Sequence, residues 1–179
     1  GNTLKLRLLI HYSKVNKADM VAKITALVNQ AGVSFFAANA DNFEMPFFNV
    51  TNRQNPIHQF EINRTNYLFP NKTLVNTMND KSDPRRPFYF TPFPFSSTAY
   101  VGAGAADAQS QKYSRMHTFL RGAGTGGTPK ADGSLDPLPA TGGITYDGVA
   151  PIRMLTFAEY NFIRAEAALY GAPGVAQTF

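Results

Sequence analysis

The chain has no cysteine and no tryptophan among its 179 residues. Without a thiol it forms no disulfide bond, no thiolate metal site and no cysteine nucleophile. No run approaches about 18 consecutive apolar residues, so the sequence predicts no membrane-spanning helix. Charged residues make up only 16% of the chain and hydrophobic ones 44%. This balance favours a folded domain with a buried core over a disordered chain.

The positive charge is scattered, although the net charge is +5. The densest charged run spans residues 81–86 and contains Asp83. Nucleic-acid-binding proteins gather Lys and Arg on one face or along one helix. We therefore expect no nucleic-acid partner.

Residues 122–127 satisfy the G-x-G-x-x-G spacing of dinucleotide-binding loops. That motif works between a strand and the N-terminus of a helix, whose amides hold the pyrophosphate. Here turn-forming residues follow, so we interpret residues 121–148 as an irregular loop. Within it, Asp132 and Asp136 lack the spacing of a calcium-binding loop.

Catalytic and metal-binding patterns are also missing. The spacing of His11, His58 and His117 suits no metal ion. Glu159 and Glu166 are seven residues apart on a predicted helix, about 10 Å along its axis, whereas a retaining glycosidase holds two carboxyl groups about 5 Å apart. No serine lies in a G-x-S-x-G turn. The sequence predicts no catalytic residue, no metal and no cofactor.

Apolar residues recur at helical spacing near both ends of the chain. Helices over about 3–15 and 18–31 form a predicted hairpin spanning residues 2–32, with Asn2 as the first cap and Gly32 as the last. A third helix is predicted over residues 156–171, opened by a capping box of Thr156 and Glu159. Such pairs are the units of helical repeat arrays.

The third predicted helix has no partner, and residues 175–179 resemble the start of one. We therefore expect residues 1–179 to form a single partial domain that exposes apolar surface and self-associates. The middle, residues 33–155, is a loop-rich excursion with a helical turn at 73–79 and an extended stretch at 88–90. The predicted fold class is mainly α, with helix pairs and long irregular loop excursions.

Aromatic residues are densest between positions 88 and 100. Six of these thirteen positions are aromatic: Phe88, Tyr89, Phe90, Phe93, Phe95 and Tyr100. Strand-like alternation would place Phe88 and Phe90 on one face. Phenylalanine has no polar group, so core packing competes with a role as a platform for sugars or peptides. We hypothesise that these six residues contribute to ligand binding.

Several segments, in order along the chain, resemble the SusD/RagB-like family of outer-membrane nutrient-binding lipoproteins. They are residues 2–7, 73–78, 83–85, 113–115 and, most strongly, 150–169. The resemblance covers most of the chain, and the order of the motifs is more specific than any one of them. We read the matched motifs as scaffold: Asp83 closes a turn, and Arg85 or Arg86 pairs with an acid.

The resemblance implies a non-enzymatic, tetratricopeptide-like helical protein at the cell surface. Members are held on the outer membrane by an N-terminal lipid, which would lie outside this segment. They deliver glycans, or in some cases peptides, to a SusC-like TonB-dependent transporter. Ligand-binding residues vary among members, so none is transferred to a position here.

Two functions remain open. One is a surface nutrient-binding module, and the alternative is a helical-repeat scaffold that binds a protein or peptide without a small-molecule ligand. An aromatic cluster exposed outside the core would favour the first. A hydrolase is a third, weaker reading, since no convergent set of titratable residues supports it.

Overall fold

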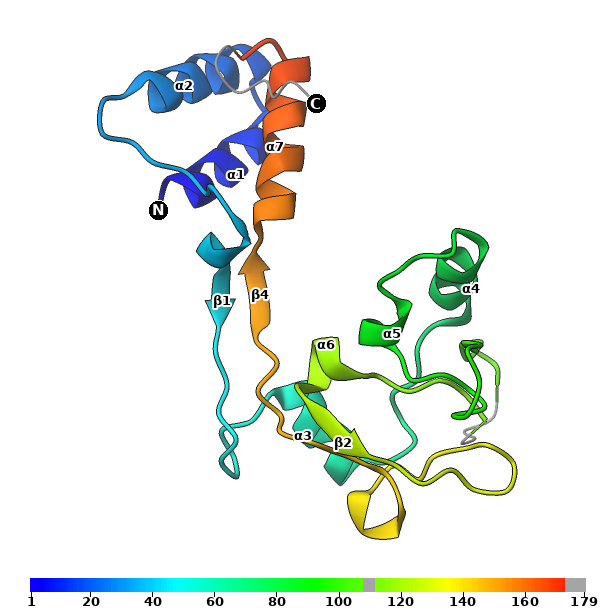
Figure 1. Cartoon of the computed structure of the whole chain (residues 1–179). Helices are drawn as coiled ribbons and strands as arrows, with labels where there is room; N and C mark the ends of the chain where they lie inside the picture. The colour runs from blue at the N-terminus through cyan, green and yellow to red at the C-terminus, as the bar shows by residue number, and fades with distance from the viewer. Residues whose placement is uncertain (108–111, 173–179) are drawn as a thin grey trace. The chain divides into compact units, whose positions relative to one another are not determined.

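The computed structural model describes residues 1–107 and 112–172. The chain divides into two compact units. The helical unit combines Gly1–Met45 with the described part of Arg153–Phe179, and the middle unit is the continuous segment Pro46–Ile152. The middle unit is thus an excursion between two segments that fold together (Figure 1).

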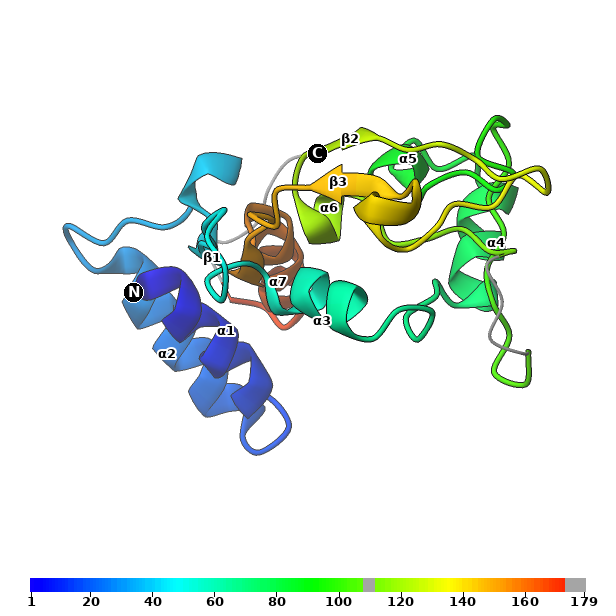
Figure 2. The same ribbon diagram turned by 90° about the horizontal axis from the view of Figure 1, so that it is seen from below.

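The helical unit is built around three helices, with α1 lying beside both α2 and α7 (Figure 2). Its elements are α1 (Asn2–Tyr12), α2 (Lys17–Asn29), the 3₁₀ turn η1 (Asn39–Asp41), β1 (Phe43–Met45), β4 (Ile152–Leu155) and α7 (Phe157–Leu169). Strands β1 and β4 pair in a two-stranded sheet. Its buried core consists of Leu6, Ile10, Met20, Ile24, Leu27, Leu155, Tyr160, Ile163, Ala167 and Ala172.

The helix caps were predicted with mixed success. The Thr156 hydroxyl accepts from the backbone N–H of Glu159 at 3.1 Å, as predicted. The Glu159 carboxylate instead pairs with Arg7 at 3.0 Å, so only half of the capping box forms. Asn2 is not a cap, because α1 already begins at this residue and its amide reaches the Ser34 carbonyl at 3.2 Å.

The middle unit contains more regular structure than the sequence analysis predicts. Its elements are α3 (Pro56–Asn63), α4 (Lys72–Asp80), α5 (Arg86–Tyr89), α6 (Thr118–Arg121), β2 (Gly124–Gly126), the 3₁₀ turn η2 (Pro139–Thr141) and β3 (Ile144–Tyr146). Strands β2 and β3 are antiparallel, with Gly124 opposite Tyr146. Helices account for most of the regular secondary structure in the described residues, which agrees with the predicted helical fold class.

The prediction of an extended segment at Phe88–Phe90 is wrong. Phe88 and Tyr89 belong to the helical turn α5, and only Phe90 is extended, in an isolated bridge with Met116. Pro87 lies in the first turn of α5, where its fixed φ and missing N–H suit a helix start. The preference of Pro87 for a helix start therefore outweighs the strand-like alternation of Phe88 and Phe90.

The predicted loop at residues 121–148 is largely irregular, but it contains two short strands, β2 and β3, and the 3₁₀ turn η2. Gly124 lies in β2, and a Cβ there would come within 2.7 Å of the Tyr146 ring. Gly122 has φ +87°, a backbone conformation that favours glycine. The next element along the chain after β2 is the 3₁₀ turn η2, so no α-helix begins at this segment as a dinucleotide-binding loop requires.

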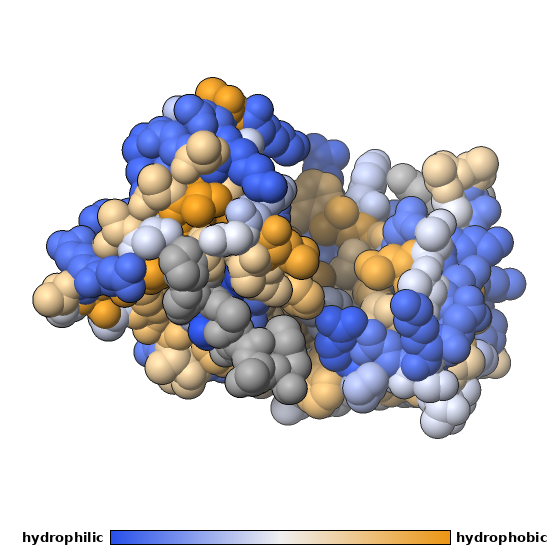
Figure 3. Space-filling model, turned by 90° about the horizontal axis from the view of Figure 1, so that it is seen from above, coloured by the Kyte–Doolittle hydropathy of each residue, from blue (hydrophilic) through white to orange (hydrophobic). Residues whose placement is uncertain are grey.

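Large apolar side chains remain exposed on the helical unit. Exposed fractions reach 64% for Leu8, 77% for Phe162 and 86% for Leu169. A space-filling view shows hydrophobic patches among hydrophilic ones (Figure 3). The predicted self-association stays a prediction, and the predicted start of a further helix at residues 175–179 lies outside the described residues. None of the described helices has the length and apolar composition needed to cross a membrane.

Candidate functional site

The structure does not gather the six candidate aromatic residues at one place. Phe90 is 2% exposed and packs with Val75 and Met78. Tyr100 lies against the same cluster, and Phe95 packs on a separate cluster that contains β3. These three residues therefore serve at least partly as core.

Of the other three, only Phe88 is exposed. Phe88 is 60% exposed. Tyr89 is half-buried: it packs against the same core cluster as Tyr100, and one face of its ring stacks on Phe119 with 4.3 Å between centroids. Phe93 is also half-buried, and its backbone N–H donates to the Ala99 carbonyl at 2.9 Å. Phe88 and Tyr89, neighbours on α5, remain the strongest candidates for ligand contact.

Tyr89 lines a groove of about 350 Å³ formed by α4, the following turn and α5. We call it the α4–α5 groove. Its volume falls in the range of small-molecule sites, about 300–1,000 Å³. The lining residues are Leu74, Thr77, Met78, Lys81, Asp83, Arg85 and Tyr89.

Helix α4 forms one wall of this groove, and its first turn is capped by Asn71. The Asn71 side chain accepts from the backbone N–H of Thr73 at 2.9 Å. Leu74, Thr77 and Met78 are three and four residues apart and therefore share one face of the helix. Leu74 is 49% exposed, so this wall offers both apolar surface and a hydroxyl group.

The turn after α4 supplies the groove's charged edge. The Asp83 carboxylate accepts from the backbone N–H of Arg85 at 2.9 Å and from its Nη2 at 2.6 Å. These hydrogen bonds, first from the side chain and then from the backbone, lower the pKa of Asp83 to about 2. Turn closure by Asp83 and pairing of Arg85 with an acid agree with the sequence analysis. The pair also faces the groove, which the sequence did not show.

The α4–α5 groove thus combines an aromatic ring, aliphatic side chains and a planar ion pair. Sugars present apolar C–H faces together with hydroxyl groups that both donate and accept hydrogen bonds. Apolar lining with a few placed polar groups is typical of sites for small ligands. Charge-assisted hydrogen bonds from a guanidinium or to a carboxylate are the stronger ones.

A second set of polar residues, buried in the middle unit, has a different role. Glu61 is fully buried, and its Oε2 lies 3.1 Å from Arg115 Nη2 and 3.6 Å from Arg121 Nη1. The cavity beside the two arginines has a volume of only about 10 Å³, room for about one water molecule. This buried ionic cluster therefore serves as scaffold rather than as a glycan site.

His58 belongs to the same buried region. It is 2% exposed, and burial, together with Arg121, lowers its pKa from 6.5 to about 4. Its ring lies edge-on to Tyr146 at 6.4 Å. The sequence analysis found no role for His58, and only a structure shows that it is buried next to a guanidinium.

A smaller hollow of about 280 Å³ lies elsewhere in the middle unit, lined in part by Tyr67, Asn71 and Asp107. Its polar groups already have partners. The Asn71 side chain caps α4, and Asp107 accepts from the backbone N–H of Gly104 at 2.7 Å. The α4–α5 groove is the better candidate. Within the described ranges, no three His, Asp or Glu residues are grouped to hold a metal ion.

Comparison with known proteins supports the resemblance seen in the sequence. A family model described as SusD-like, starch-binding and associating with the outer membrane, matches residues 1–178. No curated protein and no solved structure matches this chain.

Proposed function

We propose, on the premise that this chain belongs to the SusD-like family of starch-binding proteins associated with the outer membrane, that it binds glycans at the α4–α5 groove and does not cleave them. The observation that carries this proposal is the meeting of Tyr89 with the Asp83–Arg85 pair in one groove. A peptide ligand is the second candidate, since apolar side chains line the same groove.

In this proposal the groove residues make different kinds of contact with the ligand. The Tyr89 ring offers an apolar face to a sugar ring, and the aliphatic surfaces of Leu74 and Met78 exclude water from the contact. Asp83 is ionised at neutral pH, because its pKa is about 2, and it accepts hydrogen bonds from hydroxyl groups. The Arg85 side chain is 66% exposed and donates to other hydroxyl oxygens.

The chemistry of the groove favours binding over hydrolysis. A glycosidase uses two carboxyl groups, one of them with a raised pKa that lets it act as an acid. The groove lining contains one carboxylate, Asp83, and Arg85 lowers its pKa. Such a carboxylate holds no proton to donate at neutral pH.

We propose further that the protein works with a SusC-like TonB-dependent transporter. In this proposal an N-terminal lipid outside the described segment anchors it at the cell surface. The support is the family's association with the outer membrane. The α1–α2 pair, which is joined by a short link, supports a tetratricopeptide-like arrangement of helices. A helical-repeat scaffold that binds only protein remains the alternative.

Native electrophoresis in gels that contain soluble polysaccharide tests the proposed function. We expect amylopectin to retard the protein, and a gel without polysaccharide not to. A parallel assay for newly formed reducing ends should stay at the buffer level. Migration unaffected by amylopectin, glycogen, xylan and dextran would refute glycan binding, and release of reducing ends would refute the non-catalytic assignment.

A further inference from the structure

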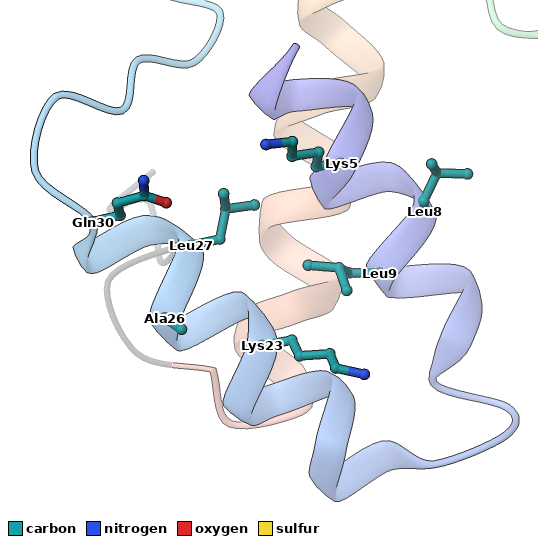
Figure 4. Close-up of a pocket in the computed structure, with 7 residues that line it drawn as sticks. All are labelled: Lys5, Leu8, Leu9, Lys23, Ala26, Leu27 and Gln30. Carbon is teal, nitrogen blue, oxygen red and sulfur yellow. The ribbon is translucent and has the colours of Figure 1, made fainter.

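The helical unit contains a second groove, which lies between α1 and α2 (Figure 4). We call it the α1–α2 groove. Its volume is about 440 Å³, larger than that of the α4–α5 groove. It is lined by Lys5, Leu8, Leu9, Lys23, Ala26, Leu27 and Gln30.

The floor of this groove is apolar and its rim is cationic. Leu9 and Leu27 project toward the space between the helices, while Lys5 and Lys23 come from opposite helices (Figure 4). Leu27 is 9% exposed, whereas Leu8 is 64% exposed. The apolar surface of the groove therefore extends from the buried side chain of Leu27 to the exposed side chain of Leu8.

Helix α1 has two apolar stripes. Leu6 and Ile10, four residues apart, are at most 5% exposed and face the core. Leu4 and Leu8, also four residues apart, are 40% and 64% exposed. A helix that is apolar on two sides is normally covered on both, and the described residues cover only one.

Positive charge predominates around the α1–α2 groove, and the nearest acid, Asp19, pairs with Lys23. The first 18 residues contain Lys5, Arg7, Lys14 and Lys17 but no Asp or Glu. Arg7 is paired with Glu159 at 3.0 Å, and Lys23 with Asp19 at 2.7 Å. Lys5 has no ion-pair partner among the described residues, and no lining residue is acidic. The uncompensated charge of the lining is that of Lys5, so a complementary surface places an acidic side chain there.

We propose that the α1–α2 groove binds an acidic amphipathic helix of a partner protein. A large apolar side chain of that helix inserts between Leu9 and Leu27, and an Asp or Glu residue beside it reaches Lys5. A helix fits because its ridges pack into the groove between two others. This interaction is separate from glycan binding and does not depend on it.

Two other occupants fit the groove less well. In a twofold contact between copies of this chain, the same cationic patch would face itself, and like charges would oppose the pairing. Copies that self-associate would use another face, such as the one with the exposed Phe162 and Leu169 of α7. A membrane surface is attracted by Lys but presents no side chain to fill a concave groove.

Fluorescence anisotropy with labelled model peptides and the whole chain tests this proposal. One peptide carries Leu at i, i+3, i+4 and i+7 flanked by Glu, and the matched peptide carries Lys in place of every Glu. Each has about 15 residues, about four helical turns. We expect the Glu peptide to bind, and the Lys peptide to bind at least about tenfold more weakly, because charge selects the partner.

Charge reversal on the protein locates the contact. Lys5→Glu should weaken binding of the Glu peptide by at least about tenfold and strengthen binding of the Lys peptide. Lys14→Glu makes the same charge change at an exposed residue outside the lining and should alter affinity less than about twofold. Both lysines are exposed, so neither variant disturbs the core, and unchanged thermal melts confirm this.

The other outcomes overturn the proposal. These are no binding of the Glu peptide, equal binding of both peptides, or equal effects of the two lysine substitutions. Binding to phosphatidylglycerol vesicles that Lys5→Glu abolishes would assign the groove to a membrane. A dimer that Lys5→Glu alters would assign it to a second copy. Retardation by polysaccharide should be the same for Lys5→Glu and wild type, which keeps this test distinct from that of glycan binding.

Discussion

Arg115 Nη2 donates to Glu61 Oε2 over 3.1 Å, and both side chains are hidden from solvent. A second guanidinium, that of Arg121, lies 3.6 Å from the same oxygen. One carboxylate therefore joins α3 to the Tyr113–Arg115 segment and to α6. The middle unit has little regular structure, so this cluster is central to how its loops are held.

Removing the charge of Glu61 should destabilise the protein strongly. Glu61→Gln leaves two buried guanidinium groups without their counter-ion, and breaking a buried ion pair costs about 3–5 kcal/mol. Asp19→Asn is the control, because it removes only an exposed pair with Lys23 and should change stability far less. Urea unfolding measures the change in the free energy of unfolding for both variants. Equal, small effects would show that the cluster is not a structural element.

The stability of the protein should fall between about pH 6.5 and pH 4 because of His58. Its folded-state pKa is about 4, below the ordinary value of 6.5. Within that window the unfolded chain binds a proton that the folded chain does not, so the free energy of unfolding decreases as the pH falls. The full shift corresponds to about 3 kcal/mol.

Unfolding by urea at several pH values measures this slope. Burial also lowers the pKa of His117, so His58→Gln should reduce the slope without abolishing it. His11→Gln, at an exposed position, is the control and should leave the slope unchanged. A slope in His58→Gln identical to that of wild type would contradict the assignment.

Asn55 should matter more than an ordinary helix cap. Its side chain accepts from the backbone N–H of Ile57 at 2.8 Å and donates to the Ala150 carbonyl at 2.7 Å, and it is 1% exposed. Asn55→Ala loses the cap and leaves a buried carbonyl unpaired, for a cost of about 2–3 kcal/mol. Asn71→Ala removes only the cap of α4, which costs about 1 kcal/mol. A reversed order in urea unfolding would contradict this account.

The sequence predicts the elements whose signals are local. Periodicity and capping residues place α1, α2, α4 and α7 to within a few residues. Helix α3 is missed because it is short, although the Asn55–Pro56 pair is the start signal that could have shown it. The hairpin of β2 and β3 is missed because its glycines suggest a loop, and only the ring of Tyr146 explains why Gly124 is needed.

The candidate site is harder to predict because it forms from folded elements. The run of aromatic residues at positions 88–100 indicated Tyr89. Of the other five, Phe90, Phe95 and Tyr100 pack in or against core clusters, and Phe93 is half-buried. Asp83 and Arg85 were interpreted as scaffold, and Leu74 and Lys81 were not singled out. Their convergence depends on the turn that brings α5 back against α4. Likewise, no local pattern reveals that Glu61 is buried next to two arginines.

Isothermal titration calorimetry with maltoheptaose tests the central claim, glycan binding at the α4–α5 groove, most directly. The account predicts that Tyr89→Ala lowers affinity by at least about tenfold, as expected for an aromatic anchor, and that Tyr89→Phe, which keeps the ring, loses less. Phe162→Ala, at a 77% exposed ring of the helical unit, should bind like wild type. Wild-type affinity in a folded Tyr89→Ala variant, or an equal loss in Phe162→Ala, would contradict the account.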